Sequence, residues 1–235
     1  MITLTLDAPG KNSLSTDLME SVLERLEKAR GEPVMFIGAN GAFSAGLNLK
    51  ELATLEGDTL FAFLELLERF MVAIYLYPGP TVACVNGHAI AGGAVITVCC
   101  DHRVMVDDAK VRIGMNEIAL GVRFPPRIFS IVRRRLLNPD RVILGSELFD
   151  ARDALAVGMV DEVATNVEEV ARARTAALGA HPRDAYAIAK RDLRGTDESL
   201  FPEAEHARTL RGMLAQWASP VVREKIAAAL SKRPS

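Results

Sequence analysis

The segments VMFIGANGAFSAGLNL, from Val34 to Leu49, and TVACVNGHAIAGGAVI, from Thr81 to Ile96, follow one pattern. Each begins with a short apolar run that is typical of a buried β-strand. An Asn-Gly pair comes next, an Ala-Gly pair follows it at the same spacing, and each segment ends in residues that can start a helix. The pairs are Asn40-Gly41 and Ala45-Gly46 in the first segment, and Asn86-Gly87 and Ala91-Gly92 in the second. The chain is therefore predicted to repeat a strand–turn–helix unit.

Glycine directly ahead of a helix has a specific chemical use. It lets backbone N–H groups approach a ligand closely, at the end of the helix where the dipole favours negative charge. Two such turns that faced each other would offer two N–H donors to one developing oxyanion. Taken alone, Gly92 and Gly93 could instead serve close packing of a helix on a strand, because short glycine motifs are weak signals. The matched motif at Gly46 favours the functional interpretation.

Composition excludes several classes of protein. The chain has 235 residues, 49% of them hydrophobic and 25% charged, as is usual for a soluble globular protein. Its net charge of −2 gives no electrostatic reason to expect binding to nucleic acid or to an anionic membrane. No Cys/His cluster has zinc-like spacing, so no metal is expected. The cysteines lie in apolar sequence, and the N-terminus lacks the pattern of a signal peptide; both indicate a cytoplasmic protein.

One uncharged stretch, Thr81–Cys100, has about the length of a membrane span. Turn pairs interrupt it at Asn86-Gly87 and Gly92-Gly93, so it is predicted to form a strand, a turn and a buried helix.

Other segments complete an α/β fold of stacked repeats, with a largely helical final third from Asp150. Strands are expected at Ile2–Leu6, Val34–Ile37, Val82–Val85, Arg103–Val106 and Lys110–Ile113. Helices are expected at Asp17–Arg30, Leu60–Leu76, Ala94–Cys100, Pro125–Leu137 and Pro220–Leu230.

Glu117 is the acidic residue best suited to proton transfer. Apart from Arg112 and Asn116, its near neighbours in the segment VRIGMNEIALGV are apolar. An apolar setting disfavours the charged form of a carboxyl group and raises its pKa toward the range of a general base. The alternative is a glutamate at a helix end that points into water.

Two other features are predicted to have structural roles. His88 is predicted to be structural, because no Ser or Cys nucleophile has a triad context. The run Arg133–Arg135 is predicted to form one charged helix face.

Together these residues resemble the enoyl-CoA hydratase/isomerase superfamily, the crotonases. The resemblance spans nearly the whole chain, with its motifs in family order. The matching pieces are Ala42–Leu49, Val85–Gly87, Ala91–Gly93, Cys100–Val104, Ile113-Gly114, Glu117, Leu120-Gly121, Gly158–Val163 and the ending Lys232-Arg233-Pro234. The resemblance implies a spiral of ββα repeats with a helical C-terminal trimerisation region. We therefore expect an acyl-CoA-binding core at residues 1–170 and a helical region at residues 171–235.

The resemblance also implies a substrate and site residues. The substrate would be an acyl-CoA thioester, with no cofactor besides the coenzyme A that the substrate carries, and the assembly a homotrimer or a dimer of trimers. The backbone N–H groups of Leu47 and Gly92 would form an oxyanion hole that holds the thioester carbonyl as it becomes an enolate. Lys50 falls where the family often contacts the phosphates of coenzyme A. Ser44 and Ala45 fall near the adenine pocket.

The departures from the family pattern bear on the reaction. Typical hydratases carry two glutamates, and the earlier position is occupied here by Val95, which cannot transfer a proton. The later glutamate is retained as Glu117. The chain is in this respect most similar to the single-glutamate Δ3,Δ2-enoyl-CoA isomerases, since one carboxylate suffices for a 1,3 proton shift. The segment Arg123–Pro126 also lacks the glycine-rich loop common in hydratases.

Two other functions remain open from the sequence. The protein could catalyse another crotonase reaction, such as hydration, retro-aldol cleavage or decarboxylation, with His88, Asn116 or Arg123 as the second group. It could also bind acyl-CoA without turnover, although the retained Glu117 argues against this.

Overall fold

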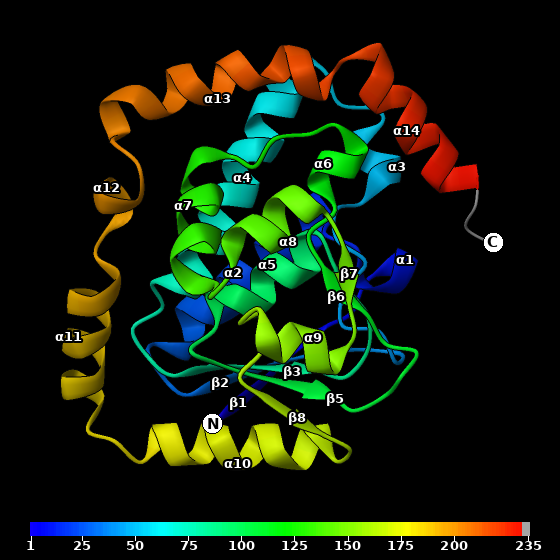
Figure 1. Cartoon of the computed structure of the whole chain (residues 1–235). Helices are drawn as coiled ribbons and strands as arrows, with labels where there is room; N and C mark the ends of the chain where they lie inside the picture. The colour runs from blue at the N-terminus through cyan, green and yellow to red at the C-terminus, as the bar shows by residue number, and fades with distance from the viewer. Residues whose placement is uncertain (232–235) are drawn as a thin grey trace.

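Short apolar strands form a five-stranded sheet in which every neighbouring pair is parallel. The computed structural model describes residues 1–231, and the sheet lies in the lower part of the molecule in Figure 1. The strand order is β1-β2-β3-β5-β8. The bounds are β1 Ile2–Leu6, β2 Val34–Gly38, β3 Thr81–Val85, β5 His102–Val106 and β8 Glu162–Ala164. Because parallel neighbours need crossover connections, the intervening helices are stacked on the sheet.

A second, smaller sheet lies apart from the first. It consists of β4 (Ala89–Ile90), β6 (Ile113–Gly114) and β7 (Leu148–Phe149), in the order β4-β6-β7. Strands β4 and β6 are parallel, with Ala89 opposite Ile113 and Ile90 opposite Gly114. Strand β7 pairs with β6 in the antiparallel direction.

The helices divide into those of the body and those of the C-terminal region, which runs from below the sheet, up one side and across the top in Figure 1. The body helices are α1 Pro9–Asn12, α2 Thr16–Ala29, α3 Leu49–Leu52, α4 Gly57–Tyr75, α5 Gly92–Cys99, α6 Glu117–Leu120, α7 Pro126–Arg135, α8 Pro139–Gly145 and α9 Ala151–Ala156. The C-terminal helices are α10 Val167–Gly179, α11 Arg183–Arg194, α12 Asp197–Leu200, α13 Glu203–Trp217 and α14 Pro220–Ser231.

Side-chain alternation along the strands gives the main sheet two apolar faces. Phe36 and Ala83 point into the large core beneath α2, α4 and α5. Met35 and Val82 point the other way, into a smaller cluster that Val167 and neighbouring residues of α10 complete. The sheet is thus covered on both faces, as all-parallel sheets are.

The predicted α/β fold with a helical C-terminal region is confirmed, and the structure adds that the main sheet is parallel. Most predicted elements form within a few residues of their expected bounds, but only Ile113 of the strand expected at Lys110–Ile113 lies in a strand. Residue 170, the proposed boundary, lies inside α10, and the ending Lys232-Arg233-Pro234 lies outside the described residues. Within residues 1–231, no helix has both the length and the apolar character needed to cross a membrane.

The two glycine-rich segments lie side by side, backbone against backbone. The N–H groups of Phe43 and Ser44 both donate to the carbonyl oxygen of His88, at 3.1 and 3.0 Å. The N–H of Ile90 donates to the carbonyl oxygen of Ser44 at 2.9 Å, so the first segment also accepts from the second. These hydrogen bonds fix the relative position of the two turns.

We predict that Gly87→Ala lowers the free energy of unfolding by about 1–3 kcal/mol, the usual cost of overpacking. A Cβ atom at Gly87 would lie 2.2 Å from the carbonyl oxygen of Gly41, so the two turns would have to separate. Gly212→Ala is the control, because its Cβ would meet nothing within 4 Å on α13. The control should gain about 0.5–1 kcal/mol from the better helix propensity of alanine. Urea unfolding measures both, and a Gly87→Ala variant as stable as the parent would contradict the prediction.

Candidate active site

The second glycine-rich turn places a free backbone N–H at the start of a buried helix. Gly92 is the first residue of α5, and Ala91 before it has φ 49° and ψ −117°, a conformation that a residue with a side chain rarely adopts. The N–H of Ala91 donates to the carbonyl oxygen of Gly114 at 2.7 Å, which holds the turn in place. Within residues 1–231 the N–H of Gly92 has no hydrogen-bond acceptor, so it is available to a ligand.

The first turn brings a second free N–H to the same place. Leu14 donates to the carbonyl oxygen of Gly46 at 2.8 Å and accepts from the N–H of Asn48 at 2.9 Å. These two bonds flank Leu47 in a parallel bridge, so its own N–H points away from Leu14. No acceptor for it is present among the described residues.

The two turns meet at glycine. A Cβ atom at Gly46, whose φ is 80°, would lie 2.7 Å from the carbonyl oxygen of Ile90 and 3.3 Å from the backbone nitrogen of Gly92. A Cβ atom at Gly92 would lie 3.7 Å from both the Cα of Gly46 and a side-chain methyl of Leu47. The two predicted donor residues, Leu47 and Gly92, are therefore brought together, from different repeats.

Glu117 reaches this region through the small sheet. Strand β6 ends at Gly114, whose carbonyl oxygen holds Ala91, and Glu117 begins α6 three residues later. The Glu117 side chain is buried, and its Oε2 has no hydrogen-bond partner within residues 1–231. Burial raises the pKa of this carboxyl group to about 8. The apolar surroundings expected for Glu117 are confirmed, and the alternative of a glutamate pointing into water is wrong.

Val95 and Asn116 are sequence neighbours of these groups, one turn after Gly92 and directly before Glu117. Val95 lies one turn after Gly92 in α5 and is buried in the main core, so it supplies neither a proton nor a hydrogen bond. The Oδ1 atom of Asn116 is buried and, like the Oε2 of Glu117, unpartnered among the described residues. Two buried oxygen atoms, one from a carboxyl group and one from a side-chain amide, are therefore without a hydrogen-bond donor among the described residues.

The other two candidates for a second catalytic group are placed differently. His88 is exposed, and its ring Nδ1 accepts a hydrogen bond from the backbone N–H of Arg112 at 3.0 Å. This contact agrees with the structural role predicted for His88. Arg123 is exposed on the loop after α6.

The residues expected near coenzyme A have unequal access to a ligand. Ser44 is fully buried; its hydroxyl donates to the carbonyl oxygen of Asn12 at 2.8 Å and accepts from the N–H of Gly46 at 3.2 Å. Its hydroxyl therefore supports the turn, and its position near the adenine pocket stays a prediction. Ala45 is half-buried, and Lys50 is exposed in the first turn of α3.

The C-terminal helices cover α6, which the sequence did not indicate. The Gln216 side chain on α13 donates to the carbonyl oxygen of Gly121 at 3.0 Å. The ammonium group of Lys225 on α14 donates to the carbonyl oxygen of Ala119 at 2.7 Å. Exposed polar residues on amphipathic helices carry no local signal for such long-range contacts.

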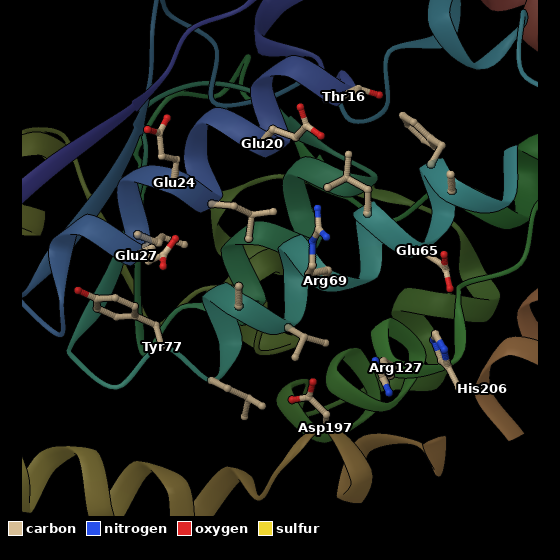
Figure 2. Close-up of a pocket in the computed structure, with 18 of the residues that line it drawn as sticks. Thr16, Glu20, Glu24, Glu27, Glu65, Arg69, Tyr77, Arg127, Asp197 and His206 are labelled. Carbon is tan, nitrogen blue, oxygen red and sulfur yellow. The ribbon is translucent and has the colours of Figure 1, made fainter. Parts of the chain in front are cut away.

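The candidate site lies outside the cavity beside α2 and α4. This cavity has a volume of about 1420 Å³, and its lining includes Glu20, Glu65 and Arg69 (Figure 2). Neither Glu117 nor the two free amides line it. Among residues 1–231, no cluster of three or more His, Cys, Asp or Glu side chains could hold a metal ion.

The sequence is similar to those of known proteins. The family model for enoyl-CoA hydratase/isomerase matches residues 1–220. A putative enoyl-CoA hydratase of Thermus thermophilus is 33% identical over 67% of this chain and 65% of its own. Enoyl-CoA delta isomerase 1 of Mus musculus is 30% identical over 71% of this chain and 60% of its own. The chain thus spans somewhat less than two thirds of the length of these curated relatives.

The fold has a close counterpart among solved structures. The human mitochondrial delta3-delta2-enoyl-CoA isomerase superimposes with a TM-score of 0.91 over 98% of this chain and 92% of its own, at 22% identity. That similarity concerns the fold, whereas the family match covers nearly the whole sequence. The chain belongs to the enoyl-CoA hydratase/isomerase family, within the crotonase superfamily.

Proposed function

We propose that the protein is an enoyl-CoA isomerase that converts a 3-enoyl-CoA to the 2-enoyl-CoA. The observation that carries the proposal is the buried carboxyl group of Glu117, which has an unpartnered oxygen. Strand β6 and the hydrogen bond from Ala91 to Gly114 join it to the turn that presents the free Gly92 amide. Val95 stands where a second acid would be needed to share the activation of water. A single carboxyl group can both take and return a proton, which is all that a double-bond shift requires.

In the proposed reaction, the carboxylate of Glu117 removes a proton from C2 of the substrate. The electron pair moves into the thioester carbonyl, and the N–H groups of Leu47 and Gly92 stabilise the negative charge on the oxygen. The enolate then collapses: a double bond forms between C2 and C3, the C3–C4 double bond breaks, and C4 takes the proton back from Glu117. The base is regenerated, and no other reactant is consumed.

Coenzyme A enters the proposal as part of the substrate, and no further cofactor is required. Lys50 is exposed beside the first turn and would contact a phosphate group, while the Ala45 backbone would lie near the adenine. We also propose that the protein acts in the cytoplasm.

A second candidate is another crotonase reaction, such as hydration, with Asn116 as the second polar group. The buried, unpartnered Oδ1 of Asn116 favours it, because that atom could accept a hydrogen bond from a water molecule held beside Glu117. A panel of thioesters separates the candidates. Robust addition of water to crotonyl-CoA would favour hydration, and tight binding without turnover of any thioester would indicate an acyl-CoA-binding protein.

We predict that Glu117→Gln lowers kcat for isomerisation of a 3-enoyl-CoA by at least about 10²-fold, the usual contribution of a proton-transfer group. The amide keeps the shape of the side chain but cannot accept the C2 proton. Glu20→Gln, an exposed change on α2, is the matched control and should retain parental activity. Near-parental kcat in Glu117→Gln would exclude Glu117 as the base.

The pH dependence follows from the raised pKa of Glu117, about 8. The reaction needs the carboxylate, so the fraction of competent enzyme falls as the pH drops below that pKa. We predict that kcat/KM rises about tenfold per pH unit between pH 6 and the pKa, and levels off above it. Initial rates from pH 5.5 to 9.5 test this. A profile that is flat across that range, or that falls with rising pH, would contradict the assignment.

We further propose that the chain assembles as a homotrimer or a dimer of trimers. Several large apolar side chains on α7–α9 and the adjoining segments are exposed, among them Leu137 (79%), Leu144 (69%) and Leu148. Exposed apolar surface of this kind is typical of an interface between subunits. Sedimentation velocity should therefore give three or six times the 25.5 kDa chain mass, and a monomer at micromolar concentration would contradict the proposal.

A further inference from the structure

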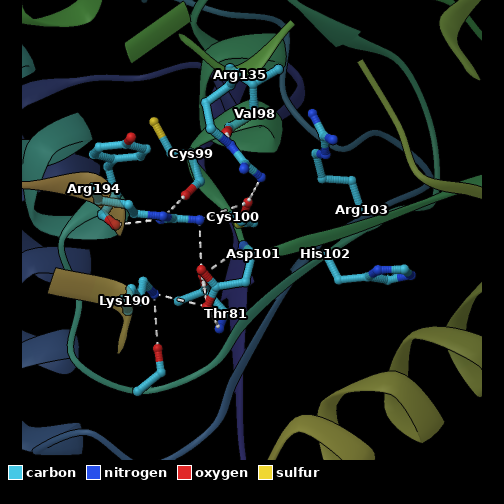
Figure 3. A network of polar contacts seen from close by, with 12 residues as sticks. Thr81, Val98, Cys99, Cys100, Asp101, His102, Arg103, Arg135, Lys190 and Arg194 are labelled. Atoms are coloured by element: carbon cyan, nitrogen blue, oxygen red, sulfur yellow. Dashed lines mark hydrogen bonds and ion pairs between the residues drawn. The ribbon is translucent and has the colours of Figure 1, made fainter. Parts of the chain in front are cut away.

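A buried cluster of charges lies at the C-terminal end of α5, the end opposite Gly92 (Figure 3). Its centre is Asp101, which follows the last turn of the helix. The Asp101 carboxylate pairs with Lys190 at 2.8 Å and with Arg194 at 2.6 Å, and it accepts from the N–H of Thr81 at 2.8 Å. The side chains of Lys190 and Arg194, both on α11, are 6% and 4% exposed. The cluster therefore ties the C-terminal region to the strand β3 and to the end of α5.

Two guanidinium groups cap the end of α5. Arg135, on α7, donates to the carbonyl oxygens of Val98 at 3.1 Å and Cys100 at 2.9 Å. Arg194 donates to the carbonyl oxygen of Cys99 at 3.0 Å. The last carbonyl groups of a helix lack partners within the helix, and positive charge at this end is favoured by the helix dipole. Arg135 is thus a helix cap, which corrects its placement with Arg133 and Arg134 on one charged face.

The capped helix is short and rigidly held. Its eight residues span about 12 Å, so a tilt at the C-terminal end moves the N-terminal amides directly. Arg194 also contacts Tyr75, the last residue of α4. Its guanidinium carbon lies 4.4 Å from the ring centroid of Tyr75, and it donates a hydrogen bond to the Tyr75 carbonyl oxygen. Arg194 therefore connects α4, α5 and Asp101 in one rigid arrangement.

We propose that Arg194 and Arg135 are positioning residues for the reaction: they hold α5 so that the Gly92 N–H points at the substrate carbonyl. This inference rests on the oxyanion hole assigned under the proposed function. The C-terminal helices would thus affect catalysis through Arg194 on α11, which lies about the length of α5 from the reacting atoms. Neither arginine contacts the substrate in this proposal.

The test uses a conjugated thioester, cinnamoyl-CoA, whose absorption moves to longer wavelength when hydrogen bonds polarise its carbonyl. We predict that Arg194→Gln reduces this shift in the bound ligand and lowers kcat for a 3-enoyl-CoA by about 10- to 100-fold. That loss is somewhat smaller than the ~10²–10³-fold effect of deleting an oxyanion-hole donor. KM should change by less than about threefold, because the lost interaction is made chiefly in the transition state.

Three further variants sharpen the test. Arg191→Gln removes the same charge from an exposed position on the same helix and should behave as the parent. Arg194→Lys keeps the charge beside Asp101 and should restore part of kcat and part of the spectral shift. Arg135→Gln removes the other cap without touching Asp101; it should show the same loss of kcat and of spectral shift, and it decides the question if Arg194→Gln does not fold.

The outcomes separate this inference from the proposed function. If the parent protein binds cinnamoyl-CoA without any shift, the oxyanion hole itself is wrong. If the parent shows the shift and the folded variants keep both the full shift and the parental kcat, the arginines serve stability alone and the inference is overturned. A lower melting temperature with unchanged kcat and unchanged shift would overturn it in the same way.

Discussion

The close approach of two glycine-rich turns is the contact on which the site depends. Gly87 lies against the carbonyl of Gly41, and Gly46 lies against the carbonyl of Ile90, at separations that leave no room for a methyl group. Hydrogen bonds between the segments then fix their register. Because the backbones touch, the free N–H groups of Leu47 and Gly92 are supplied by different repeats and need no side chain to aim them. The strained φ of Ala91 is retained at this same point, as is common where backbone geometry serves function.

The small sheet joins that contact to the carboxyl group. Strand β4 leads into Ala91 and Gly92, its neighbour β6 leads into Glu117, and the hydrogen bond from Ala91 to Gly114 ties the two together. Burial then gives Glu117 its raised pKa, and side chains of α13 and α14 donate hydrogen bonds to the end of α6. The same desolvation that makes the carboxylate a stronger base also limits the pH range in which it is ionised.

Different kinds of contact hold the two ends of helix α5. Its first turn is fixed by backbone contacts between the two glycine-rich segments, and its last turn by guanidinium groups from α7 and α11. The Asp101 carboxylate balances part of the positive charge gathered there, which lowers the cost of placing cations in the interior. The C-terminal region therefore holds the helix that starts at Gly92, in addition to packing on the sheet.

Much of this architecture could be predicted from local sequence. Apolar runs and turn pairs located four of the five main strands and the helices α2, α4, α5 and α7, and the matched spacing of the two motifs indicated the paired turns. The apolar neighbours of Glu117 were enough to predict the apolar surroundings of its carboxyl group, which is buried. Strands β4, β7 and β8, of two or three residues, are too short to show a period.

Contacts between distant segments were decided by the tertiary structure alone. Ser44 has the sequence context of an exposed turn residue, yet it is buried because its hydroxyl bonds to Asn12, 32 positions away. Arg135 and Arg194 have the context of ordinary helix charges, yet both cap α5, the latter from 95 positions along the chain. Periodicity and composition report which residues are apolar and how the nearby backbone turns. Which carbonyl a buried arginine meets depends on how separate helices pack, and that is set only when the whole chain has folded.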